Sequence, residues 1–145
     1  MQEKSQPTPI VLEVVTVIKD GKRKEKSVIE AKGTLYEKAD ATFIMYEDEL
    51  EVGKVSNTVK IVNNDITIIR RGAVSMRQHF VQGKLTEGVY QSPLGTMGMM
   101  TKTKQINFHW NPKTHFGKVD LSYELTLQDH NVGTHTVTLK MKGAH

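Results

Sequence analysis

The sequence predicts an all-β protein, a single antiparallel meander β-barrel of about eight to ten strands. Three observations predict this class. Val, Ile, Thr and Tyr are frequent in runs whose hydrophobic residues recur at every second position. Gly, Asn, Asp and Pro interrupt these runs at short intervals. No stretch of roughly ten residues or more combines a helical period with capping signals.

The first half of the chain contains a polar lead-in and four predicted strands. We expect residues 1–8 to form a flexible lead-in and residues 9–145 to form one β-barrel domain. The first strand covers residues 10–18, and its apolar face comprises Ile10, Leu12, Val14, Thr16 and Ile18. After turns at Asp20 and Gly21, at Ala39 and Asp40 and around Gly53, the next strands are predicted at 28–35, 41–47 and 54–62.

The second half repeats this plan with clearer turns. Asn63, Asn64 and Asp65 mark the plainest hairpin, because Asn and Asp tolerate the positive φ that a tight turn between strands requires. Residues 129–133 are predicted to form the last turn. Further strands are predicted at 66–71, 74–81, 85–91, 94–110, 119–127 and 134–141.

Short turns between successive strands favour pairing of neighbours in sequence, and hence a meander. Strands that are apolar on one face must bury that face and must also protect their edges. Closing the sheet into a barrel achieves both. A two-sheet sandwich is the structural alternative, because alternation alone does not distinguish the two.

Five segments, in order along the chain, carry a resemblance to a known family: residues 58–61 (TVKI), 68–76 (IIRRGAVSM), 80–83 (FVQG), 90–95 (YQSPLG) and 100–103 (MTKT). Together they resemble the YwiB-like family of small uncharacterised bacterial proteins, which is grouped as a domain of unknown function. The similarity extends over nearly the whole chain. It implies a calycin-like, lipocalin-like β-barrel, and it carries over no catalytic or binding residue.

Composition excludes several classes of protein. The chain of 145 residues has no Cys, which excludes disulfides, thiolate metal sites and a cysteine nucleophile. We expect a cytoplasmic protein without a membrane partner, because no apolar run approaches the roughly 20 residues of a membrane span. The net charge is +4, but aromatic residues make up only 6% and acidic residues interrupt the basic runs, so we expect no nucleic-acid partner.

Arg70 is the main candidate for binding. It shares a strand face with Ile66 and Ile68, the face predicted to be interior, where an unpaired charge is very unfavourable. In one interpretation Arg70 anchors the carboxylate or phosphate head of a ligand. In the other it forms an internal ion pair with Glu47 or Glu30, or reaches solvent at the rim; a paired arginine is the commoner arrangement.

Tyrosine, methionine and phenylalanine side chains would line the interior around Arg70. A phenol offers apolar area with one polar group, and Met adapts to irregular spaces, so these residues suit either a ligand pocket or a filled core. How much of the interior they fill separates the two interpretations. The candidate ligand-binding residues beside Arg70 are Tyr46, Met76, Phe80, Tyr90, Met97, Met99 and Tyr123.

Neither a metal site nor an enzyme is indicated by any motif. The histidine pairs His109 and His115, and His130 and His135, each flank a predicted turn but bring no further ligands, so we expect no metal and no cofactor. No nucleophile elbow, phosphate-binding loop or dinucleotide fingerprint is present. The acidic residues Glu47, Asp48 and Glu49 are interpreted as a solvated connecting loop.

We therefore expect a non-enzymatic protein that binds a small, mostly apolar and anionic ligand inside the barrel. The alternative is a filled barrel that acts through its outer surface, by self-association into a homo-oligomer or by binding a protein or RNA. An enzyme is the third hypothesis.

Overall fold

The computed structural model describes residues 7–144, which form ten antiparallel strands closed into one barrel. The strands follow their sequence order around the barrel, and β1 pairs with both β2 and β10. This confirms the predicted meander barrel. No helix in the described residues is long and apolar enough to cross a membrane. The strands are β1 (Thr8–Asp20), β2 (Arg23–Lys38), β3 (Ala41–Leu50), β4 (Gly53–Val62), β5 (Asp65–Gly72), β6 (Ser75–Phe80), β7 (Leu85–Ser92), β8 (Gly95–Asn111), β9 (Phe116–Leu127) and β10 (His130–Gly143).

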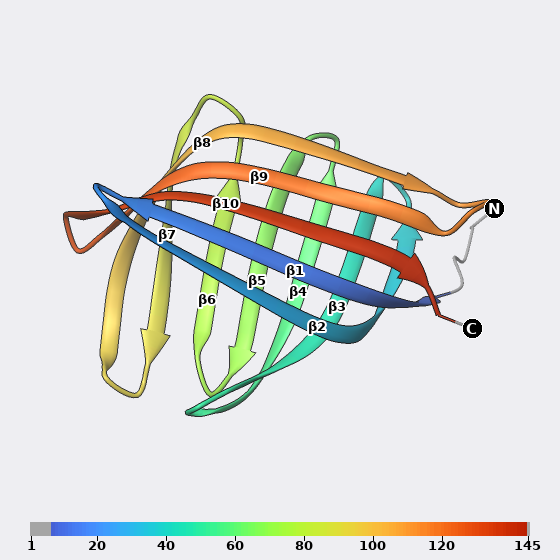
Figure 1. Ribbon diagram of the computed structural model, residues 1–145, viewed down its shortest axis with the longest axis horizontal. Helices are drawn as coiled ribbons and strands as arrows, with labels where there is room; N and C mark the ends of the chain where they lie inside the picture. Colours follow the sequence, from blue (N-terminus) through green and yellow to red (C-terminus); the bar gives the residue numbers. More distant parts are fainter. Residues whose placement is uncertain (1–6, 145) are drawn as a thin grey trace.

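Long and short strands divide the barrel into two layers. Figure 1 shows β8, β9, β10, β1 and β2 lying side by side, while β3 to β7 cross behind them at a steep angle. The first group has 12 to 17 residues per strand, and the second has 6 to 10. The barrel is therefore flattened, and the core lies between the two layers.

Strict alternation along the strands directs one set of side chains to the interior, as the sequence predicts. Phe80, Ile44 and Ile66 are fully buried, and each lies on the inward face of its strand. The buried cluster draws on both layers, which makes it one continuous core. Its members are Ile10, Leu12, Val14, Leu35, Ile44, Val59, Ile61, Ile66, Phe80, Met99, Ile106, Val119, Leu121, Tyr123, Leu125, Leu139 and Met141.

Most turns lie where the sequence places them. Asn63 follows β4 with a φ of 59°, and Ala39 follows β2 with a φ of 55°. The last turn differs from the prediction, because Gln128 and Asp129 form it and β10 begins directly afterwards. Part of the predicted turn at 129–133 is thus strand, with a register shift between Asn131 and Thr134 that resembled a turn in the sequence.

Two further boundaries differ from the sequence expectations. Glu47, Asp48 and Glu49 lie inside β3, where they pair with β4, and not in a connecting loop. Hydrogen bonding to the neighbouring strand outweighs the low strand propensity of acidic residues there. β1 begins at Thr8, within the expected lead-in 1–8, of which residues 1–6 lie outside the described part of the chain.

Gly33 marks a close approach between three strands. It lies in β2, opposite Ile10 of β1 and Tyr46 of β3. A Cβ atom at this position would collide with the carbonyl oxygen of Met45 and would lie 2.9 Å from Leu12 Cδ1. A side chain at Gly33 would therefore force β2 away from a neighbouring strand.

We expect Gly33→Ala to lower the free energy of unfolding by about 2 kcal/mol, because the backbone of β3 must move to admit the methyl group. Gly98→Ala is the matched control, since a Cβ there has nothing within 4 Å, and its effect should stay within about 0.5 kcal/mol. Urea denaturation measures both variants. Equal effects of the two substitutions would contradict the close approach.

Candidate functional site

Five of the sequence candidates form one continuous row across the barrel. Inward residues of β3 to β8 are direct cross-strand partners, so each contacts the next around the wall. Unlike the apolar core, the row is half-buried except at Asn57, which is buried. In order, it comprises Tyr46, Asn57, Arg70, Met76, Tyr90 and Met97.

Arg70 is held by two neighbours from β3 and β4. Its Nε donates to Asn57 Oδ1 at 3.0 Å, and its Nη2 lies 3.4 Å from Asp48 Oδ2. The two charged side chains are 22% and 11% exposed, so the ion pair is largely shielded from water. The structure therefore contains the internal ion pair, with Asp48 in place of the expected Glu47 or Glu30.

The other three candidates lie deeper and fill the core. Phe80 and Tyr123 pack edge to face, with ring centroids 4.9 Å apart. Met99 is 4% exposed and belongs to the same buried cluster. These side chains occupy interior volume themselves, as is common in small barrels.

Burial affects the acid–base properties of two tyrosines. Burial raises the pKa of Tyr46 to about 12, while Arg70 opposes this shift and Asp48 adds to it. Burial also raises the pKa of Tyr123 to about 12, against smaller opposing effects of a hydrogen bond with Gln78 and of Arg70. Both phenols are therefore neutral in the folded protein below that range.

Two buried polar atoms in the interior have no hydrogen-bond partner among the described residues: Thr103 Oγ1 and His135 Nε2. Both residues are cross-strand partners of Tyr123, one on each side, and the His135 ring stacks on the tyrosine at 5.2 Å. Burial lowers the pKa of His135, which favours the neutral ring.

The described histidines do not form a metal-binding group with acidic residues. Within residues 7–144 no group of three or more His, Asp or Glu side chains is placed to hold a metal ion. His115 instead stacks on Trp110, with ring centroids 5.7 Å apart.

A large hollow lies outside the barrel, on the face of the long strands. This outer groove has a volume of about 920 Å³ and is lined by residues of β1, β2, β8, β9 and β10. Phe116 on β9 is 57% exposed there, and Val11 on β1 lies two strands away, with Lys142 of β10 between them. A smaller hollow of about 270 Å³ borders Arg70, together with the exposed Arg71 and Arg77.

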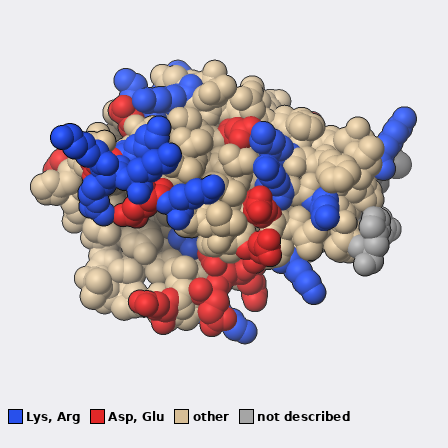
Figure 2. Space-filling view, viewed as in Figure 1, with Lys and Arg blue, Asp and Glu red and all other residues tan. Residues whose placement is uncertain are grey.

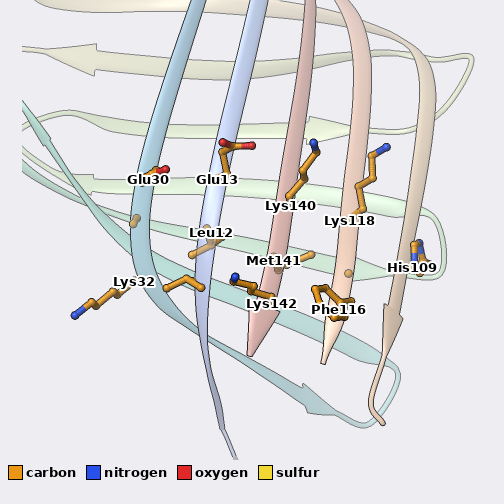
Figure 3. Close-up of a pocket in the computed structure, with 13 residues that line it drawn as sticks. Leu12, Glu13, Glu30, Lys32, His109, Phe116, Lys118, Lys140, Met141 and Lys142 are labelled. Atoms are coloured by element: carbon orange, nitrogen blue, oxygen red, sulfur yellow. The ribbon is translucent and has the colours of Figure 1, made fainter. Parts of the chain in front are cut away.

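Charged residues cross the outer groove in a register that the sequence analysis missed. Glu30, Glu13, Lys140 and Lys118 are successive cross-strand partners on β2, β1, β10 and β9. Figure 3 shows these four side chains in one line across the strands. Only the closure of the barrel brings β1 beside β10, so alternation within single strands gave no signal for this row.

The charges in this row are separated by sign. The two glutamates lie on β2 and β1, and the two lysines lie on β10 and β9. Elsewhere on this face both signs occur, and Figure 2 shows a dense basic patch at its left end, where β1 turns into β2. Glu13, Glu30 and Lys140 make no ion pair with any residue in the range 7–144, while Lys118 lies 3.6 Å from Asp120. Solvent faces both halves of the row.

Comparison with known proteins places this chain in a family. The model of a domain of unknown function (DUF1934) matches residues 12–139. The chain belongs to this family. The family match spans nearly all of the barrel, from β1 to β10.

A sequence relative and a solved structure agree with the fold. The uncharacterised β-barrel protein YwiB of Bacillus subtilis (strain 168) is 30% identical over 138 residues, which cover 95% of this chain and 96% of that protein. The crystal structure of the ywiB protein from Bacillus subtilis superposes with a TM-score of 0.88 at 28% identity, over 97% of this chain and 96% of that one. The barrel is thus shared with YwiB, and the family is described as a domain of unknown function.

We expect Arg70→Leu to destabilise the fold by about 1–3 kcal/mol, because the largely shielded Asp48 carboxylate and Asn57 would lose their partner. Arg71→Leu is the matched control, since Arg71 is its exposed neighbour, and should change stability by less than about 0.5 kcal/mol. Chemical denaturation measures both. In a chain that already carries Asp48→Asn, Arg70→Leu should lower the free energy of unfolding by less than it does in the original chain. An equal loss in both chains would contradict the ion pair.

We expect the phenolate absorbance of Tyr46 and Tyr123 to appear only near pH 12. Their raised pKa values favour the neutral phenol in the folded state, so their stabilising effect is complete below the unfolded pKa of 10.0 and is lost as pH rises toward 12. Ultraviolet difference titration measures this, and a variant with both residues changed to Phe should lose the late step. Ionisation of these phenols near pH 10, the ordinary pKa of tyrosine, would show that water reaches them.

Proposed function

We propose that this protein is a non-enzymatic binding module that acts through the outer groove on β2, β1, β10, β9 and β8. The observation that carries this proposal is the location of a large hollow: about 920 Å³ of space lies outside the barrel, while the interior holds a continuous core. Sites of this size commonly hold ligands or parts of partners.

The composition of the outer groove indicates the kind of partner. Exposed Phe116 and the half-buried Val11 offer apolar area, and charges of both signs surround them. A purely anionic partner would meet the carboxylates of Glu13 and Glu30 as well as the lysines. The charge distribution therefore favours a protein surface that carries both signs over a simple anionic molecule or a nucleic acid.

A ligand inside the barrel is the second candidate, and one observation supports it. Thr103 Oγ1 and His135 Nε2 are buried without partners, and a bound molecule or ordered water would satisfy them. Arg70 is a less favourable anchor for the head group of such a ligand, because Asp48 and Asn57 already bind its guanidinium. The sequence also predicts a calycin-like barrel and a cytoplasmic location, and we keep both as part of this proposal.

Lysine footprinting tests the proposal. We expect Lys118, Lys140 and Lys142 to react several-fold more slowly with an acetylating reagent in an extract of the producing cells than in dilute purified protein, because a partner covers them. Lys54 and Lys84 are matched controls, since they are exposed but lie outside the outer groove. Mass spectrometry of the peptides measures the rates.

Equal reactivity of the groove lysines in extract and in dilute solution would overturn the proposal. The interior candidate predicts a different result: native mass spectra of freshly purified protein would show a retained small molecule. That molecule would be lost in Arg70→Leu and kept in Arg71→Leu.

A further inference from the structure

Like charges lie directly opposite each other on the outer groove, which is unusual for neighbouring strands. Glu13 is the register partner of Glu30, and Lys140 is the register partner of Lys118. Opposed like charges destabilise a strand pair. A sequence in which Glu and Lys alternated across the four strands would avoid both repulsions. The observed order, with two glutamates followed by two lysines, is therefore explained more simply by a partner that supplies the opposite charges.

We propose that the partner is a second copy of this chain, docked on the same face by a two-fold axis that runs along the seam between β1 and β10. This inference rests on the proposed function, in which the outer groove is the binding surface. The rotation turns the face over and exchanges the β1 side with the β10 side. Each copy therefore presents its acidic half to the basic half of the other, as an isologous interface requires.

The register carries this match residue by residue. Glu13 and Lys140 lie next to the seam on opposite sides, so the rotation places Glu13 of one copy over Lys140 of the other. Glu30 and Lys118 lie one strand further out on each side, and the same rotation brings them together. The symmetry makes each contact twice.

A second row of the outer groove follows the same rule. Lys32, Val11, Lys142 and Phe116 are successive partners on β2, β1, β10 and β9, and Figure 3 shows Lys32, Lys142 and Phe116 along this line. The rotation places Lys32 over the exposed ring of Phe116, a cation–π arrangement, and Val11 over the aliphatic stem of Lys142. No pair of like charges meets in either row.

The hollow shape of the outer groove suits this docking. Packed sheets lie about 10 Å apart, a distance that opposing long side chains fill from both sides. A groove of about 920 Å³ accepts the lysine and glutamate side chains of the second copy. Individual exposed ion pairs are weak and screened by salt, so we expect a reversible dimer that weakens as ionic strength rises.

Sedimentation equilibrium of the purified full chain at low salt tests this proposal with charge reversals. We expect a concentration-dependent dimer whose dissociation constant rises at least about tenfold in Lys118→Glu/Lys140→Glu, and likewise in Glu13→Lys/Glu30→Lys. Mixing these two double variants should form a heterodimer, because an acidic face then meets a basic one. The variant with all four reversals should form homodimers again, since its face is self-complementary.

Lys54→Glu/Lys84→Glu is the matched control, with the same change in net charge outside the outer groove, and should dimerise like the original chain. A chain that stays monomeric at every concentration at low salt overturns the proposal. So does a dimer that tolerates the reversals, or one that neither mixing nor the fourfold reversal restores. If the lysines are protected in extract but the chain is monomeric, the binding surface stands and its occupant is another protein.

Discussion

Hydrogen bonding between β1 and its two neighbours closes the barrel, and the other features depend on this closure. β1 pairs with β2 along its full length and with β10 over most of it. The closure protects the edges of the first and last strands and seals the apolar faces inside. It also brings the beginning and the end of the chain side by side, which creates the outer groove where those strands lie.

The interior is stabilised by more than apolar packing. A half-buried polar row crosses six strands and includes Arg70, whose guanidinium is held by Asp48 and Asn57. Next to this row, the core is closely packed, with Tyr123 between Phe80 and His135. The ion pair with Asp48 already neutralises the Arg70 guanidinium, which the sequence analysis proposed as a ligand anchor. The structure therefore favours the outer surface over the interior as the binding site.

Local sequence patterns predicted most of the fold and the inward position of Arg70. They did not predict the ion-pair partner of Arg70 or the charged row of the outer groove. Period-two alternation identified the inward face that includes Arg70, and Asn63 identified its turn, because both depend on neighbours in sequence. The partner of Arg70 was missed because Asp48 was assigned to a connecting loop, whereas it lies in β3. The row from Glu30 to Lys118 depends on the register between β1 and β10, which no local pattern encodes.

The central claim is that the outer groove of this barrel, and not its interior, binds a second copy of the chain. Amide chemical shifts, recorded as the protein concentration is raised from micromolar to millimolar, test it most directly because they locate contacts residue by residue. The account predicts progressive shifts at Val11, Glu13, Phe116 and Lys140. Spectra that do not change with concentration, or shifts confined to the row around Tyr46 and Arg70, would contradict it.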